Sequence, residues 1–244
     1  LEKVKSCVSE AKVLDTEIVC ITGGEPMLYP HHVNEIVSEC NRLSIPEIWL
    51  FTNGFWANNS SRARTITKNL KAWGLTKVFL SVDVFHQDYI PIEFVKNAIK
   101  ASQRADLEVC IDARFIGQPD ENNIYNSATR SFLESLGTLL SNIEVTRAQP
   151  LFVGRAAEIL SRHVKKMPLS KVIDEKCPGA WPGGTLKSPL GVDVDEFGFV
   201  TICPGLSIGN TYATSLRKIL GRYDYQNHAV IAALYDNGMG GLMD

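Results

Sequence analysis

Two patterns of apolar and polar residues alternate along the first two thirds of the chain. Short, continuous apolar runs fit strands that are buried on both faces, whereas longer stretches with apolar residues three and four positions apart fit amphipathic helices. Strand-like and helix-like segments follow each other five times, which indicates parallel βαβ units. The expected strands lie at residues 18–21, 48–51, 78–83, 107–115 and 143–145.

The pattern changes at about residue 165, where proline, glycine and short extended pieces replace the regular alternation. Residues 191–203 fit two strands joined by a turn, and two amphipathic helices follow, near residues 216–220 and 230–234. We therefore expect a first domain at 1–165 and a second, smaller one at 166–244.

The first expected strand runs directly into Thr22, Gly23, Gly24 and Glu25. Glycine at the carboxyl end of a parallel strand lets a ligand lie against bare backbone, and Glu25 places an anion beside that surface. A ligand with an ammonium group would suit such a site. The alternative interpretation is a tight turn between strand and helix, with Glu25 in solvent.

Polar residues also end the next strands, namely Asn53, then Ser81 with Asp83, then Arg114. Loops at the carboxyl ends of parallel strands carry the chemistry of barrels and open sheets alike, so these residues are candidate ligand contacts. His86, three residues after Asp83, is a candidate acid or base. Structural alternatives are a turn at Asn53, a helix cap at Asp83 and a surface position for His86.

Length, composition and net charge exclude several classes of protein. The chain has 244 residues, of which 45% are hydrophobic, and this is enough to bury a substantial core. Its formal net charge is -2, so no basic field predicts binding to nucleic acid or to a membrane surface. No apolar run approaches the roughly 18 residues of a membrane-spanning helix, and a cytoplasmic location is expected. A Rossmann site would need Gly-x-Gly-x-x-Gly at the start of a helix, which is not found here.

Six cysteines are present without a Cys-x-x-Cys pair, so their spacing does not indicate a zinc site. Four of them lie on apolar helix stripes or in strand runs and fit small buried hydrophobes. Cys177 and Cys203 differ, because each precedes proline in Pro- and Gly-rich sequence where no apolar periodicity explains it.

Several of these segments, taken together and in this order, resemble the radical SAM enzymes. They are residues 23–26, 52–54, 81–83 and 154–156. The hairpin that ends at Cys203, with 208–210 after it, resembles the twitch or SPASM extension of that family. The resemblance implies an α/β fold: a partial (β/α)6 TIM-like barrel with a C-terminal β-hairpin plus helices. Residues 51–56, Asp83-x-x-His86 and Cys177-Pro178-Gly179 are similar in particular to enzymes that epimerise residues in peptides.

The resemblance implies a definite chemistry. A [4Fe-4S] cluster would cleave S-adenosylmethionine reductively, and the 5'-deoxyadenosyl radical would abstract hydrogen from a peptide or small-molecule substrate, as in epimerisation or thioether formation. An electron donor such as flavodoxin or ferredoxin is the implied partner. The implied S-adenosylmethionine contacts are Gly23, Gly24, Glu25, Asn53, Ser81, Asp83 and Arg114.

The same resemblance implies roles for two cysteines. Cys177 and Cys203 would be two metal ligands of an auxiliary [4Fe-4S] cluster, since thiolates are what such clusters require, and the remaining ligands are expected beyond Asp244. Alternatively, Cys203 would be catalytic as a hydrogen-atom donor to a substrate radical, with His86 as a further catalytic residue. Two unrelated thiols are the structural alternative.

One departure from the family lies at the start of the chain. The Cys-x-x-x-Cys-x-x-Cys motif is missing from the 22 residues before Gly23, where Cys7 is the only cysteine besides Cys20. We expect that the sequence begins after this motif, with the main cluster's ligands upstream of Leu1. Two other functions stay open: a cluster-free relative that binds peptide or nucleotide, and an ordinary barrel enzyme with a phosphate or metal site at residues 23–25.

Overall fold

A computed structural model describes residues 1–177 and 184–243 of the chain. The described residues form two compact units. The parallel-sheet unit is Thr16–Lys165, and the antiparallel-sheet unit combines Leu1–Asp15 with Lys166–Asp244. Each unit is described separately below.

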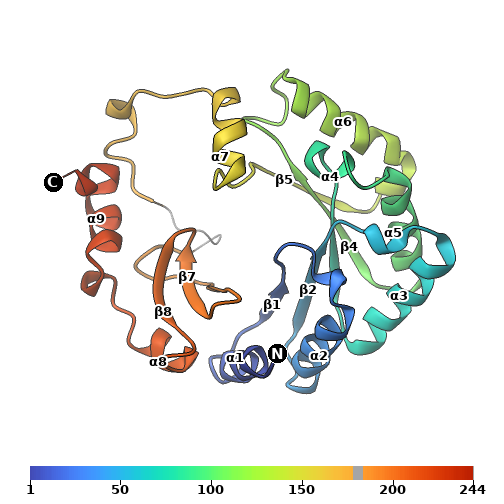
Figure 1. Cartoon of the computed structure of the whole chain (residues 1–244), viewed down its shortest axis with the longest axis horizontal. Coiled ribbons are helices and arrows are strands. Elements are labelled where there is room, and N and C mark those ends of the chain that lie inside the picture. Colours follow the sequence, from blue (N-terminus) through green and yellow to red (C-terminus); the bar gives the residue numbers. More distant parts are fainter. Residues whose placement is uncertain (178–183, 244) are drawn as a thin grey trace. The chain divides into compact units, whose positions relative to one another are not determined.

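The parallel-sheet unit alternates strands and helices (Figure 1). Its strands are β1 (Ile18–Ile21), β2 (Glu47–Thr52), β3 (Lys77–Ser81), β4 (Glu108–Arg114) and β5 (Glu144–Ala148). Its helices are α2 (Pro30–Arg42), α3 (Ser60–Trp73), α4 (Val84–Gln87), α5 (Ile92–Arg104), α6 (Ile124–Leu136) and α7 (Arg155–Leu160). Short 3-10 helices are η1 (Pro26–Leu28), η2 (Phe55–Ala57), η3 (Gly137–Leu140) and η4 (Ser161–His163).

All neighbouring strands of this sheet are parallel, in the order β1-β2-β3-β4-β5. The α/β class and the five strands expected from the apolar runs are therefore confirmed. Parallel pairing requires a crossover after each strand, and the helices between the strands supply it. Helices α2, α3, α5 and α6 lie on one side of the sheet (Figure 1).

The two faces of the sheet have different side chains because successive residues of a strand point to opposite faces. One face carries fully buried aliphatic residues such as Leu50, Leu80 and Ile111. The other face carries aromatic and polar residues. There the register pairs Phe51 with Phe79, and the two rings stack at 4.3 Å between centroids. The rings of Phe51 and Phe79 therefore lie just before the carboxyl ends of β2 and β3.

Two asparagine side chains at the start of α6 hold the segment between β4 and this helix. Asn126 is fully buried, and its side-chain oxygen accepts a hydrogen bond from the backbone N–H of Ile116 at 2.8 Å. Its amide nitrogen donates to the carbonyl oxygens of Ile116 at 3.0 Å and Gln118 at 2.9 Å. Asn123 caps α6 by accepting from the Asn126 N–H. One asparagine thus satisfies the backbone polar groups of a loop that no strand pairs with.

The antiparallel-sheet unit contains a three-stranded sheet in the order β6-β7-β8. The elements of this unit are α1 (Glu2–Val13), η5 (Leu169–Lys171), β6 (Asp193–Val194), β7 (Phe199–Cys203), β8 (Leu206–Asn210), α8 (Leu216–Gly221), η6 (Tyr225–Asn227), α9 (Ala229–Asn237) and η7 (Gly238–Leu242). Strands β6 and β7 form the hairpin predicted within residues 191–203. The third strand, β8, was not predicted.

Helix α1 belongs to this second unit although it opens the chain. Cys7 packs in a core cluster with Val200, Leu216 and Ile219. The Lys3 Nζ donates to the Thr211 carbonyl oxygen at 2.7 Å. These contacts join residues about two hundred positions apart in the sequence.

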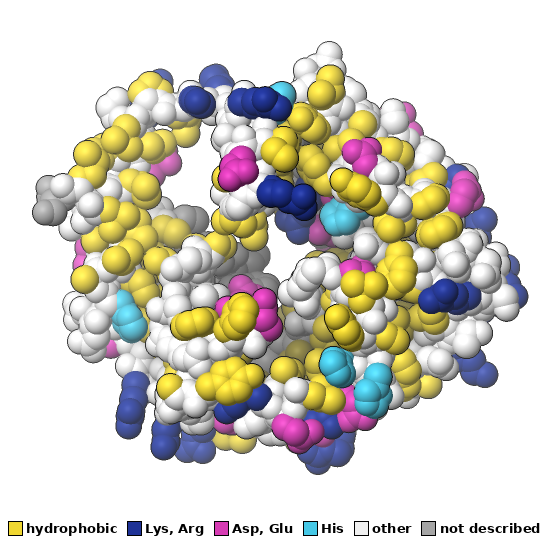
Figure 2. All heavy atoms as spheres, viewed as in Figure 1, with side chains coloured by type: hydrophobic (Ala, Val, Ile, Leu, Met, Phe, Trp, Pro, Cys, Tyr) yellow, Lys and Arg dark blue, Asp and Glu magenta, His cyan; other side chains and the backbone are white. Residues whose placement is uncertain are grey.

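The surface is mixed in charge. On the face shown in Figure 2, basic and acidic side chains are both scattered among hydrophobic and uncharged ones. Among the described residues, no helix combines the length and the apolar character that crossing a membrane requires.

Candidate functional site

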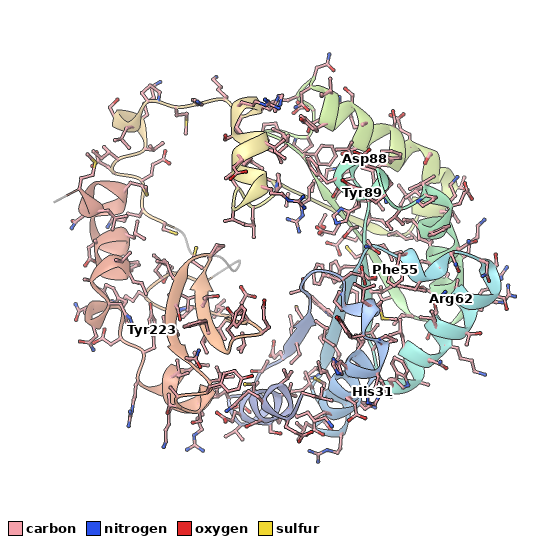
Figure 3. The ribbon with its side chains drawn as sticks, viewed as in Figure 1. His31, Phe55, Arg62, Asp88, Tyr89 and Tyr223 are labelled. Carbon is pink, nitrogen blue, oxygen red and sulfur yellow. The ribbon has the colours of Figure 1, made fainter. Side chains whose placement is uncertain are left out.

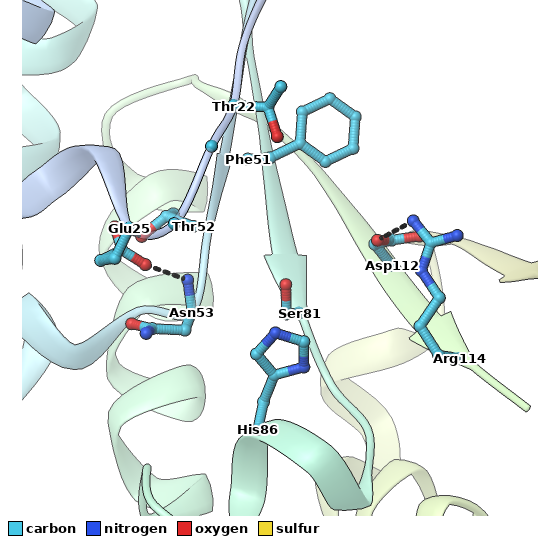
Figure 4. Close-up of a pocket in the computed structure, with 11 residues that line it drawn as sticks. Thr22, Glu25, Phe51, Thr52, Asn53, Ser81, His86, Asp112 and Arg114 are labelled. Atoms are coloured by element: carbon cyan, nitrogen blue, oxygen red, sulfur yellow. Dashed lines mark hydrogen bonds and ion pairs between the residues drawn. The ribbon is translucent and has the colours of Figure 1, made fainter. Parts of the chain in front are cut away.

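A pocket lies at the carboxyl edge of the parallel sheet, where the first four strands end (Figure 4). Its volume is about 190 Å³. The lining residues are Thr22, Gly23, Gly24, Glu25, Phe51, Thr52, Asn53, Ser81, His86, Asp112 and Arg114. The strand-end residues predicted as ligand contacts therefore lie together, with the exception of Asp83, which lies behind His86.

The glycine turn leaves its backbone open. A Cβ built on Gly23 or Gly24 would meet no other described atom within 4 Å. Gly23 has φ +136°, a conformation that residues with a side chain rarely adopt, whereas Gly24 lies outside that range. Ligand atoms can therefore approach the peptide groups at this turn without meeting a side chain.

Glu25 has a structural role that the sequence did not show. Its Oε1 accepts hydrogen bonds from the Met27 N–H at 2.9 Å and from the Thr52 hydroxyl at 2.8 Å. Its Oε2 accepts from the Asn53 N–H at 2.7 Å. The carboxylate therefore caps η1 and ties the end of β1 to the end of β2, and an ionised carboxylate has about four acceptor positions, so it can still take a ligand donor.

Asn53 is in the turn that the sequence offered as its alternative. Its Oδ1 accepts from the Phe55 N–H at 2.9 Å, and Gly54 follows with φ +76°. Ser81 is buried at the end of β3 and lines the pocket. Asn53 and Ser81 thus line the same pocket as the glycine turn and His86.

Asp83 and His86 form a pair at the start of α4. Asp83 is 0% exposed and caps this helix by accepting from the N–H groups of Phe85 and His86. The His86 Nδ1 lies 2.8 Å from the Asp83 Oδ1. Tyr89, two residues after the end of this helix, is 84% exposed and is labelled in Figure 3.

The charge on His86 is stabilised by its surroundings. Burial of the ring opposes the charged form, but the hydrogen bond and charge of Asp83, together with the charge of Asp112, outweigh it and raise the pKa of His86 above its usual value. The charge of Arg114 lowers the pKa of His86. His86 is therefore a titratable group beside a pocket, which is a common feature of functional sites.

Asp112 and Arg114 form the far wall of the pocket. The Arg114 Nη2 lies 2.7 Å from the Asp112 Oδ2, and the Thr146 hydroxyl donates to the Asp112 Oδ1 at 3.1 Å. Sequence reasoning named Arg114 and missed Asp112. The sequence could have indicated Asp112, because it lies two positions before Arg114 in the same strand and such residues have side chains on the same face.

Cys177 and Cys203 lie in the antiparallel-sheet unit, whereas every residue that lines the pocket lies in the other. Both pack against the cluster of Leu186, Ile202 and Ile231. Burial, followed by the neighbouring Cys177 thiol, raises the pKa of Cys203. Of the predicted Cys-Pro-Gly motif, Pro178 and Gly179 lie outside the described residues.

Fold and site together define an α/β protein with a polar pocket at the carboxyl edge of a parallel sheet. No family model matches the chain, and no curated protein matches it. Solved structures of oxaloacetate acetylhydrolase do match. One has a TM-score of 0.44 and 10% identity over 67% of this chain, which corresponds to 61% of that chain.

Two further matches are to oxaloacetate acetylhydrolase in complexes. The complex with the inhibitor 3,3-difluorooxalacetate has a TM-score of 0.39 and 11% identity, and covers 63% of this chain and 68% of that one. The complex with the product oxalate has the same TM-score and coverage at 10% identity. Similarity this low carries no argument about the reaction of the present chain.

The resemblance to the radical SAM family is corrected by these findings. No family model supports it, and the solved structures named above are acetylhydrolases. In residues 1–177 and 184–243, no group of three or more His, Cys, Asp or Glu side chains could hold a metal ion. Radical cleavage of S-adenosylmethionine, the twitch or SPASM assignment and iron–sulfur chemistry are therefore not retained.

Proposed function

We propose that this chain carries the active site of an enzyme, and that this site is the pocket at the carboxyl edge of the parallel sheet. The observation that supports the proposal best is the open backbone of Gly23 and Gly24, which faces a pocket walled by ionisable side chains. In α/β proteins, ligands bind outside the carboxyl ends of parallel strands. The finer fold, a partial (β/α)6 barrel, is part of this proposal.

The ligand is a small polar molecule that carries an amino group. About 190 Å³ is less than the usual volume of a pocket for a drug-sized molecule, so the pocket takes a polar fragment rather than a large apolar group. Backbone carbonyl oxygens at Gly23 and Gly24, with the remaining acceptor capacity of Glu25, suit an ammonium group. Arg114 has five N–H donors and keeps some for a carboxylate after pairing with Asp112.

An amino-acid moiety combines these two groups. S-adenosylmethionine ends in such a moiety, and we keep it as a candidate ligand, without a cluster and without a radical step. Free methionine presents the same moiety alone, and oxalate presents carboxylates without an amine. These compounds separate recognition of the amine from recognition of an anion.

The test is calorimetric titration of the protein with S-adenosylhomocysteine, methionine and oxalate. We expect the amino-bearing compounds to bind and oxalate to bind at least tenfold more weakly. Gly24→Ala should weaken binding at least tenfold, which is about 1.4 kcal/mol, because its methyl group occupies the open approach to the backbone.

Gly221→Ala is the matched control, since Gly221 also has open space around a built Cβ and lies outside the pocket. This variant should bind as the unmodified protein does. Binding that is equally strong in Gly24→Ala, or preference for oxalate over the amino compounds, contradicts the proposal.

A further inference from the structure

We propose that His86 is the acid–base residue of this pocket, and that Asp83 positions it so that Nε2 exchanges a proton with the bound ligand. The inference rests on the proposed function, because a ligand must occupy the pocket. It adds a type of chemistry, proton transfer, and a specific atom at which this chemistry occurs.

The position of Asp83 is strongly determined. Its Oδ1 accepts from the Phe85 N–H at 3.0 Å and the His86 N–H at 3.2 Å, besides its contact with the His86 ring. Its Oδ2 accepts from the backbone N–H of Arg114 at 3.2 Å. A fully buried carboxylate held by backbone donors from two elements cannot move without breaking several of these bonds. It therefore provides a fixed acceptor.

This fixed acceptor determines which nitrogen of His86 carries the proton in the neutral ring. Asp83 accepts at Nδ1, so the neutral ring is protonated there and has its lone pair on Nε2. A buried carboxylate that orients an imidazole through Nδ1–H is also how a histidine base is prepared in hydrolytic triads.

The ring is accessible from the pocket. The His86 side chain is 37% exposed, in contrast to the completely buried Asp83. Figure 4 shows the ring rising from α4 toward Ser81, with Asn53 on one side and the Asp112–Arg114 pair on the other. The charged groups that influence the ring are Asp83, Asp112 and Arg114.

The proton balance of the step is simple. A ligand X–H bond breaks, the electron pair stays on X, and the proton forms a bond to Nε2. The resulting imidazolium is paired with Asp83, and the same proton returns to the product in the second half of the reaction. No oxidant or metal is needed for this step.

The first experiment is long-range ¹H–¹⁵N NMR of the protein over a range of pH. His31 and His32 are control resonances, because they lie on α2 and do not line the pocket; the His32 ring stacks on Tyr29 and lies beside the His31 ring. We expect neutral His86 to be the Nδ1–H tautomer and to titrate above its ordinary value of 6.5. An Nε2–H tautomer overturns the inference.

Variants separate positioning from folding. Asp112→Asn should lower the pKa of His86 and keep its tautomer, because Asp112 acts on the ring through charge alone. Asp83→Asn should lower this pKa more and remove the preference for Nδ1–H. If Asp83→Asn does not fold, the tautomer of the unmodified protein and the pKa of His86 in Asp112→Asn still test whether Asp83 positions the ring.

The second experiment adds a ligand. With S-adenosylhomocysteine bound, we expect the Nε2 resonance of His86 to shift and those of His31 to stay in place. A probe that binds in a Gly24-dependent way without shifting Nε2 overturns this inference and leaves the proposed function standing. If none of the three compounds binds, the proposed function fails and the inference fails with it, whatever the tautomer.

Discussion

At the scale of single residues, Glu25 shows that a side chain that lines the pocket can also hold the fold together. It accepts from the Met27 N–H, the Thr52 hydroxyl and the Asn53 N–H, so it connects two strand ends. Thr52 in turn accepts from the indole N–H of the buried Trp56 at 3.1 Å. A change at Glu25 therefore alters both these contacts and the lining of the pocket.

We predict that Glu25→Gln lowers the free energy of unfolding by about 1 to 3 kcal/mol, because an amide has one acceptor oxygen for the donors that the carboxylate now satisfies. The measurement is urea unfolding followed by circular dichroism. Glu93→Gln is the control: it removes one exposed ion pair with Lys96 and should change stability by less than about 1 kcal/mol. Equal effects of the two substitutions would contradict the structural role of Glu25.

His86 gives a prediction for pH. Its folded-state pKa is raised, so its contribution to stability is fully present below its ordinary value of 6.5 and is lost as pH rises through the higher folded value. The stability difference between the unmodified protein and His86→Gln should therefore shrink from pH 5.5 to pH 8.5. Thermal melts at both pH values measure it, with His32→Gln as control. A difference that grows with pH would show that the sign of the shift is wrong.

At the scale of elements, the loop between β4 and α6 depends on Asn126. We predict that Asn126→Ala destabilises the parallel-sheet unit by about 1 to 3 kcal/mol, because it leaves the buried N–H of Ile116 without its acceptor and removes one of the two donors to the Ile116 carbonyl oxygen. Hydrogen exchange of residues 115–123 should accelerate. The matched control is Asn122→Ala. Asn122 is exposed and accepts one hydrogen bond from Ser127 at 3.3 Å, so this substitution should lower the free energy of unfolding by less than about 0.5 kcal/mol.

Sequence reasoning was most accurate for elements that are periodic in the sequence. The apolar runs located all five parallel strands, and Asp83 caps α4 as its alternative interpretation stated. Strand β8 was missed because Leu206–Asn210 mixes apolar and small polar residues, and its pairing with β7 includes register irregularities. Periodicity alone does not report such a strand.

Side-chain partners were less predictable than positions. The sequence placed Glu25 beside the glycines but could not show that its carboxylate binds the end of β2, because those contacts join residues 27 and 28 positions apart. The family resemblance failed for a related reason. Short strand-end motifs meet general requirements of a parallel sheet, so they identify a site without identifying its chemistry.

At the scale of the whole molecule, the first helix and the last third of the chain form one unit. We predict that Cys7→Asp unfolds the antiparallel-sheet unit, because it places a charge in the cluster of Val200, Leu216 and Ile219. Hydrogen exchange resolved by segment should show loss of protection in β7 and β8, while β2 to β4 stay protected.

Val4→Asp is the control for this prediction, since Val4 lies on the same helix with 41% of its surface exposed. It should leave the exchange of both units nearly unchanged. Loss of protection in the parallel sheet after Cys7→Asp would contradict the division into two units.

The stacked rings on the polar face of the parallel sheet have an optical consequence. Phe51 lines the pocket and stacks on Phe79, and Phe79 lies 5.2 Å from the ring of Trp49. We predict that a ligand in contact with Phe51 displaces these rings and so changes the fluorescence emission of Trp49. Trp49→Phe should abolish the change, and a change that survives would come from another tryptophan. An emission change that depends on Trp49 would make this residue a fluorescent reporter of the pocket, with which ligands can be screened without any label.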